Sequence, residues 1–244
     1  MVVGPNRQDA VDAAARLGDV LVVDGPLQLA PRPADLALLV VDAEAPWGSG
    51  ACPPRGDLRA PSDRLLAEAD VVVRVVDPAA PAGAGTRFPN SFKSARVRTD
   101  SVDQIPVFDA ETTSRGVHVQ GRLVPFSELG GRPVGLVTGL ARPGRVRRFL
   151  ERRGVHVASP IEVHDHGFVR MGERAAARLA KRLRAETCDL WLTTAKCAAG
   201  LGPWLDRMGV PFGILDHEVR PSDPLRIHLE SRVTPRCRAS RGCS

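Results

Sequence analysis

The chain of 244 residues is 43% hydrophobic, enough to bury the core of one large or two smaller domains, and no apolar run in it is long enough to span a bilayer. Its net charge of +6 at pH 7 indicates an anionic partner, which could be nucleic acid, anionic lipid headgroups or a phosphorylated glycolipid, but the lack of tyrosine and the aromatic content of 4% argue against stacking on single-stranded bases. The five cysteines are scattered and odd in number, which argues against a disulfide framework and favours a reducing compartment.

The first part of the chain, to about residue 77, alternates apolar strand runs with helical segments. The pattern predicts helices over residues 9–17 and 61–69, and strands over residues 21–23, 38–41 and 71–73. Two of the strand runs are followed by a carboxylate, Asp24 and Asp42. Such runs are typical of a parallel sheet that is covered on both faces and carries functional groups at the carboxyl ends of its strands. An Asp after a strand is also an ordinary turn former or helix N-cap, so both roles stay open.

The middle of the chain differs from the first part in composition and in its hydrophobic pattern. A stretch rich in Pro, Ala and Gly at residues 78–85 predicts a loop or a domain boundary. Shorter alternating runs at 95–107 and 116–125, with a turn at Gln120-Gly121, predict antiparallel strands that connect two domains.

The last part of the chain, from about residue 132, alternates strands and helices again. Strands are predicted over 134–138, 155–158, 190–193 and 211–215, and helices over 145–153, 171–185 and 200–208. This order predicts a small Rossmann-like α/β unit. The tail 231–244 carries Arg, Ser, Gly and Cys without periodicity, so we expect it to be disordered.

Several short segments follow one another in an order that indicates one family. They read Asp24-Gly25-Pro26-Leu27-Gln28-Leu29, Val41-Asp42-Ala43, Trp47-Gly48-Ser49-Gly50, Gly56-Asp57-Leu58-Arg59-Ala60-Pro61, Ala69-Asp70-Val71, Val137-Thr138-Gly139-Leu140-Ala141-Arg142-Pro143, Asp165-His166-Gly167-Phe168 and Leu192-Thr193-Thr194-Ala195-Lys196-Cys197. In order and spacing these segments resemble tetraacyldisaccharide 4'-kinases, the lipid A 4'-kinases of Gram-negative envelope synthesis. The resemblance runs from about residue 2 to about residue 219.

The resemblance implies both a fold and a reaction. The fold is α/β, with an N-terminally truncated, P-loop-kinase-like parallel sheet and a smaller Rossmann-like α/β domain joined by an antiparallel hairpin linker. We place the remainder of the kinase core at 1–85, the linker at 86–130, the C-terminal domain at 131–230 and the basic tail at 231–244. The implied reaction transfers the γ-phosphate of ATP, with Mg²⁺, to the 4'-hydroxyl of a lipid A disaccharide precursor. We expect a cytoplasmic protein, peripheral on the inner membrane, with no nucleic-acid partner.

The resemblance also implies site residues. His166, beside Asp165, matches the His that activates the sugar hydroxyl, and a His next to a carboxylate can accept a proton near neutral pH. The alternative is a polar loop in which Asp165 or a neighbour caps the next helix. The other implied roles are magnesium binding by Asp24, nucleotide contacts by Gln28, Thr194 and Lys196, and contact with an anionic substrate group by Arg59. Helix capping for Thr194 and an ordinary surface position for Arg59 are the alternatives.

The chain departs from the family pattern in two ways. No Gly-x-x-x-x-Gly-Lys-Ser/Thr phosphate loop occurs in these 244 residues, and the family places that loop upstream of the point where this chain begins. Gly25, Leu29, Asp57, Ala60 and Cys197 replace the family's Asp, His, Pro, Glu and Asp. These differences predict a truncated or weakly active kinase. The alternative is a non-catalytic paralogue that binds an anionic glycolipid or nucleic acid through a basic face formed by the arginine clusters at 142–153, 170–184 and 232–241.

Overall fold

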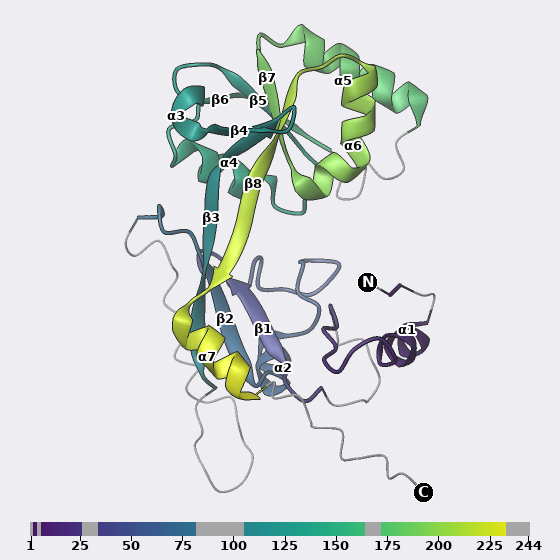
Figure 1. Ribbon diagram of the computed structural model, residues 1–244, viewed down its shortest axis with the longest axis vertical. Helices are drawn as coiled ribbons and strands as arrows, with labels where there is room; N and C mark the ends of the chain where they lie inside the picture. Colours follow the sequence, from purple (N-terminus) through teal and green to yellow (C-terminus); the bar gives the residue numbers. More distant parts are fainter. Residues whose placement is uncertain (1, 4–5, 26–33, 82–104, 164–171, 233–244) are drawn as a thin grey trace, which may run out of the picture. The chain divides into compact units, whose positions relative to one another are not determined.

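The computed structural model describes residues 2–3, 6–25, 34–81, 105–163 and 172–232 (Figure 1). The chain forms an α/β fold with a mostly parallel sheet, and contacts divide it into two compact units. Unit 1 comprises Met1–Val76, Gly83–Ala110 and Pro221–Ser244, and unit 2 comprises Asp77–Ala82 and Glu111–Arg220. No helix within the described ranges is both long and apolar enough to cross a membrane.

Unit 1 is built on a parallel pair of strands. Its described elements are α1 (Arg7–Ala14), β1 (Leu38–Asp42), α2 (Ser62–Ala67), β2 (Val71–Val76), the first residues of β3 (Val107–Val119) and α7 (Asp223–Arg232). Leu38 lies opposite Val71, and β2 also neighbours β3. Alternate residues of β2 enter separate clusters, because Val72 packs with Leu66 of α2 whereas Val71 packs with Leu225 of α7. Strand β2, which lies between β1 and β3, is therefore covered on both faces, as its continuous apolar run predicts.

The prediction of a strand over residues 21–23 is wrong. These residues have no regular secondary structure, and Val22 is 96% exposed. A buried parallel strand needs a neighbouring strand for its N–H and C=O groups and helices over its faces. None of the described strands pairs with this run, so its apolar composition alone does not make it a strand.

Unit 2 contains four parallel strands and an antiparallel hairpin. Its described elements are the rest of β3, β4 (Arg122–Pro125), α3 (Phe126–Leu129), β5 (Val134–Thr138), α4 (Pro143–Glu151), β6 (Val157–Glu162), α5 (Glu173–Ala185), β7 (Leu190–Thr194), α6 (Ala195–Arg207) and nearly all of β8 (Phe212–Pro221). The strand order is β3-β8-β7-β5-β6, with β4 antiparallel to β3. Gln120 and Gly121 both have positive φ, 49° and 82°, which suits a tight two-residue hairpin turn.

Helices cover both faces of the parallel strands in unit 2, with α4 on one face and α5 and α6 on the other (Figure 1). One core cluster joins Phe149 and Leu150 of α4 to Val134 and Leu136 of β5. A second cluster joins buried leucines of α5 and α6 to Val137 of β5. The three layers form because neighbouring residues of β5 point to opposite faces and both sets are apolar.

Helices α6 and α7 differ from the sequence-based expectation, and the short α3 was not predicted either. Helix α6 begins at Ala195 rather than at residue 200, because Thr194 caps it and the helix continues through Gly200 and Pro203. Helix α7 was not predicted. The sequence signal was Ser222 followed two residues later by Pro224. The Ser222 hydroxyl accepts from the Leu225 N–H at 3.4 Å, and Pro224 lies in the first turn, where a proline is tolerated.

Candidate functional site

The carboxyl ends of β5 and β7 form the first part of the candidate site. The chain leaves β5 towards β6 on one side and leaves β7 towards β8 on the other, so the strand order reverses between β5 and β7. In open α/β sheets, ligands bind beside such a reversal, outside the carboxyl ends of the strands. The loop after β5 and the start of α6 meet there, and both belong to the segments singled out in the sequence.

Two hydrogen bonds hold these two segments together, and a third lies within the start of α6. The Gly139 N–H donates to Sγ of Cys197 at 3.3 Å, and the Thr193 hydroxyl donates to the Val137 carbonyl at 2.8 Å. Oγ1 of Thr194 accepts from the Cys197 N–H at 3.4 Å, which caps α6. Cys197 and Thr193 are buried, so the β5 and β7 ends are fixed by groups that solvent does not reach. Cys197, one of the departures from the family pattern, still supplies an acceptor here.

The start of α6 offers an environment suited to an anion. The first N–H groups of a helix lack intrahelical partners and carry the positive end of the helix dipole. Lys196 is exposed in this first turn, so its ammonium group is accessible to solvent. Because the Thr194 side chain already caps the helix, the alternative role for this residue is confirmed, and any nucleotide contact would be added to the capping role.

The loops of unit 1 that hold Arg59 fold back on themselves. The Ser49 hydroxyl donates to Oδ1 of Asp57 at 3.3 Å, and the Leu58 N–H donates to the Ala51 carbonyl at 3.1 Å. A Cβ added to Gly56 would collide with Ser49 and with the Ala51 carbonyl, so only glycine fits there. Asp57, another departure from the family pattern, thus joins the two loops. Arg59 is exposed beside them.

The remaining predicted site residues fall into two groups. Asp24 is exposed and lies directly after residues 21–23, which form no strand. Gln28, Asp165 and His166 lie outside the described residues. Across the described ranges, no group of three or more His, Cys, Asp or Glu side chains is placed to hold a metal ion.

A histidine–carboxylate pair that the sequence did not reveal lies on β3 and β8 in unit 2. Nε2 of His118 is 3.3 Å from Oδ1 of Asp216, and Nε of Arg115 donates to Oδ2 of Asp216 at 3.1 Å. The Arg115 hydrogen bond holds the pKa of Asp216 below its ordinary value, and His118 adds to this effect. The pair is separated by 98 residues in the chain, so only the pairing of two strands could reveal it.

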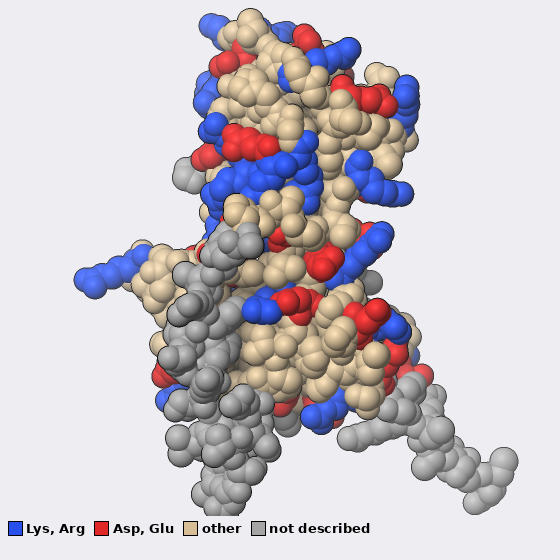
Figure 2. Space-filling view, turned by 90° about the vertical axis from the view of Figure 1, so that its left-hand side faces the viewer, with Lys and Arg blue, Asp and Glu red and all other residues tan. Residues whose placement is uncertain are grey.

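Arg147 of α4, its C-cap Arg152 and the next residue, Arg153, form internal ion pairs. Nε of Arg147 bonds Glu151 at 2.7 Å, while Arg153 and Arg152 bond the buried carboxylate of Asp77 at 2.9 and 3.2 Å. Figure 2 shows Lys and Arg gathered in a band on one side of the molecule, with acidic side chains beside it. Part of the arginine cluster at 142–153 therefore has a structural role.

Comparisons with known proteins agree with the order of the motifs. Residues 1–225 match the model of the family described as tetraacyldisaccharide-1-P 4'-kinase. The tetraacyldisaccharide 4'-kinase of Geobacter metallireducens is 31% identical over 236 residues, which are 94% of this chain and 64% of that protein. The corresponding protein of Syntrophus aciditrophicus is 29% identical over 219 residues, covering 86% of this chain and 56% of its own. The corresponding protein of Anaeromyxobacter dehalogenans strain 2CP-C is 33% identical over 205 residues, which are 83% of this chain and 52% of that protein.

A solved structure of LpxK from Aquifex aeolicus, described as an "apo" form in complex with ATP, matches with a TM-score of 0.44 and 18% identity over 82% of this chain and 51% of that chain. The chain spans between 52% and 64% of the length of the three relatives named above.

Proposed function

Because the chain belongs to the tetraacyldisaccharide-1-P 4'-kinase family, we propose that it serves the transfer of the γ-phosphate of ATP to the 4'-hydroxyl of a lipid A disaccharide precursor. The family match over residues 1–225 carries this proposal, because it includes both segments that meet at the carboxyl ends of β5 and β7. The finer fold proposal is a kinase-core remainder at 1–85, a hairpin linker at 86–130 and a Rossmann-like domain at 131–230. The proposed location is the cytoplasmic face of the inner membrane.

In the proposed reaction, the 4'-hydroxyl oxygen forms a bond to the γ-phosphorus while the bond from that phosphorus to the β-phosphate oxygen breaks and ADP leaves. His166, supported by Asp165, accepts the hydroxyl proton. Lys196, exposed at the start of α6, contacts the nucleotide phosphates, with Gln28 and Thr194 as further contacts. Arg59 binds an anionic group of the acceptor through its guanidinium.

The described residues do not by themselves form a magnesium site. The segment of Asp24 is irregular and exposed, and the described parts of the chain hold no cluster of three or more possible ligands. A divalent cation in a kinase is held by carboxylates together with the phosphates of the nucleotide. We therefore assign no step to magnesium, and the role of Asp24 as its ligand stays a prediction.

We further propose that the 244-residue chain by itself has no more than trace activity. Phosphoryl transfer depends mainly on positioning and electrostatic stabilisation of the transferred group. In P-loop kinases the Gly-x-x-x-x-Gly-Lys-Ser/Thr loop supplies much of both, and that string is absent from these residues.

The test is a 4'-kinase assay with Mg²⁺-ATP and a tetraacyl disaccharide 1-phosphate acceptor. The 244-residue chain is compared with a chain extended upstream to any in-frame start that encodes a phosphate loop. We expect activity in the extended chain, reduced at least about tenfold by His166→Ala and by Lys196→Ala. Arg178→Ala, an exposed change on α5, is the matched control and should leave turnover unchanged.

Two outcomes would contradict these proposals. Appreciable turnover by the 244-residue chain would show that the phosphate loop is not required. Inactivity of both chains, with retained binding of the acceptor in a direct binding measurement, would favour a non-catalytic paralogue that binds the anionic glycolipid.

A further inference from the structure

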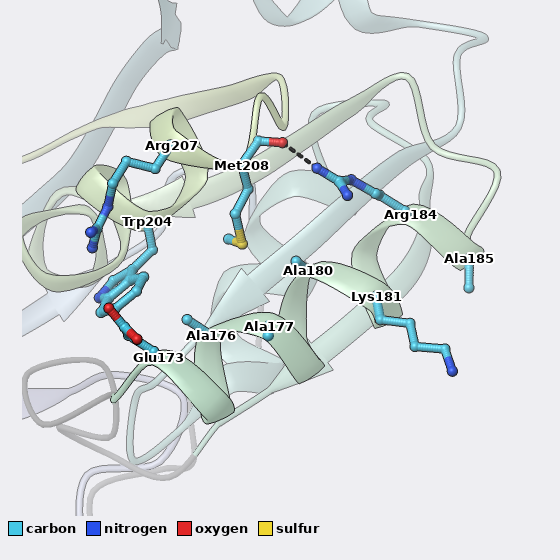
Figure 3. A pocket seen from close by; sticks show the side chains of 10 residues that line it. All are labelled: Glu173, Ala176, Ala177, Ala180, Lys181, Arg184, Ala185, Trp204, Arg207 and Met208. Carbon is cyan, nitrogen blue, oxygen red and sulfur yellow. Dashed lines mark hydrogen bonds between the residues drawn. The ribbon is translucent and has the colours of Figure 1, made fainter.

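A groove of about 650 Å³ runs between α5 and α6 on the surface of unit 2 (Figure 3). Its floor is formed by Ala176 and Ala180, which are buried, and Trp204 and Met208 of the opposite side are half-buried. The small alanine side chains leave space above α5, and the larger side chains on the other side border it. The groove is therefore apolar at its base and open to solvent.

The groove is bordered by cations. Lys181, Arg184 and Arg207 line it and are exposed, whereas Glu173 is the only acidic residue among the lining residues that the structure describes. Nη2 of Arg184 donates to the Met208 carbonyl at 2.5 Å, and the Arg207 guanidinium lies 4.0 Å from the ring centroid of Trp204. These contacts hold two of the three cations beside the apolar base, so little side-chain entropy is lost when an anionic partner binds.

We propose that this groove docks an acidic amphipathic helix of a partner protein. An apolar base between cationic edges complements a helix with one apolar face and flanking Asp or Glu residues. Tryptophan, methionine and arginine are the side chains enriched at the centres of protein interfaces. Helix α5 has 13 residues, a length of about 20 Å, which accommodates roughly four turns of a partner helix.

Two other occupants fit the geometry less well. A bilayer presents a broad surface, and the apolar residues of this groove lie at its base, below the charged edges. A single lipid chain is usually enclosed over most of its surface by its pocket. This groove is open, so it would leave much of such a chain exposed to water.

The probe for this proposal is a designed helical peptide of about 18 residues with leucines at i, i+3, i+4 and i+7 and glutamates on its flanks. Its binding is measured by isothermal titration calorimetry at low and high salt, beside an otherwise identical peptide with lysines in place of the glutamates. We expect a Kd in the range of about 1–100 µM for the acidic peptide, weakening with salt, and no binding of the basic peptide.

Matched charge reversals on α5 make the test specific to the groove. The double variant Lys181→Glu, Arg184→Glu alters two lining residues, whereas Arg178→Glu, Arg182→Glu makes the same charge change at exposed positions of the same helix outside the groove. We expect at least about a tenfold loss of affinity in the first variant and less than about a threefold loss in the second. Circular dichroism checks that both variants are folded.

Several outcomes would overturn the proposal. Equal losses in the two double variants would mean that only net charge matters. No binding of the acidic peptide at about 100 µM would mean that the groove does not accept such a helix. Binding of phosphatidylglycerol vesicles without peptide binding would assign the surface to a membrane, and concentration-dependent dimerisation that is lost in the first double variant would assign it to a second copy of the chain.

Discussion

At the scale of single residues, Asp77 shows how one buried carboxylate can be stabilised by its neighbours. Its side chain is 8% exposed and bonds Arg152, Arg153 and the Ala79 N–H. Burial alone would raise the pKa of Asp77, but the hydrogen bonds from Arg153, Ala79 and Arg152 outweigh it and hold that pKa below its ordinary value. A carboxylate whose folded-state pKa is lowered stabilises the fold above its unfolded-state pKa.

The substitution Asp77→Ala should lower the free energy of unfolding by about 3 kcal/mol at pH 7, because it leaves two partly buried arginines without their shared acceptor. The difference between wild type and variant should shrink as the pH falls from about 5 to about 2, since the wild-type carboxylate is then protonated. Urea unfolding at several pH values measures both effects. A difference that stays constant over this range would contradict the role of the charged form.

The predicted site residues differ in how far local sequence could place them. Thr194 precedes an apolar helical segment, and the capping role considered for it is confirmed. Gly139 and Cys197 are 58 residues apart, so their contact depends on the pairing of β5 with β7. The same limit explains why His118 and Asp216 were not singled out.

At the scale of elements, α6 shows two local signals in conflict. Gly200 and Pro203 are poor helix formers, yet both lie within the helix. The cap at Thr194 and the packing of Leu201 and Leu205 in the core outweigh them. Tertiary burial commonly overrides a weak propensity of this kind.

The cap itself can be tested separately from any nucleotide contact. Thr194→Ala should lower the free energy of unfolding by about 1 kcal/mol, because the Cys197 N–H loses its acceptor, whereas Thr194→Ser keeps the hydroxyl and should cost less. Chemical denaturation measures both variants. An equal loss in the two would indicate that the threonine methyl group, rather than the hydroxyl, stabilises this end of α6.

The β3–β4 hairpin contains two glycines, Gly116 and Gly121, that are constrained in different ways. Gly116 has φ 154°, and an added Cβ would collide with the Val124 carbonyl on β4. Gly121 has φ 82° in the turn, and nothing lies within 4 Å of an added Cβ. Only the backbone conformation therefore constrains Gly121, whereas Gly116 is also constrained by the neighbouring strand.

Alanine at these two positions should consequently differ in effect. We expect Gly121→Ala to lower the free energy of unfolding by about 1 kcal/mol, and Gly116→Ala to lower it further, because β4 must move to admit the methyl group. Thermal unfolding of the two variants compares them directly. A Gly116→Ala protein as stable as Gly121→Ala would mean that the hairpin adjusts without loss.

At the scale of the whole molecule, each unit has its own core clusters, and β3 and β8 contribute residues to both units. The motifs that indicate the family are distributed over both units as well, so a substitution in one core need not disturb the motifs of the other. The family model spans residues 1–225 and thus the described elements of both units except most of α7. The relatives named above are longer, which is why activity is best compared between this chain and an extended one.

By itself, the sequence determined the α/β class, the strand β1, the buried strands β2, β5 and β7, and the family, because continuous apolar runs and the order of short motifs are local properties of a chain. The burial of β1 was not determined in this way, since Leu38 and Val40 are exposed. Only the tertiary structure decided that residues 21–23 form no strand, since burial needs a neighbouring strand and a covering helix. It alone brought Gly139 to Cys197 and His118 to Asp216, and it alone formed the groove between α5 and α6. Contacts between residues far apart in the chain depend on strand order and helix packing, which no local pattern specifies.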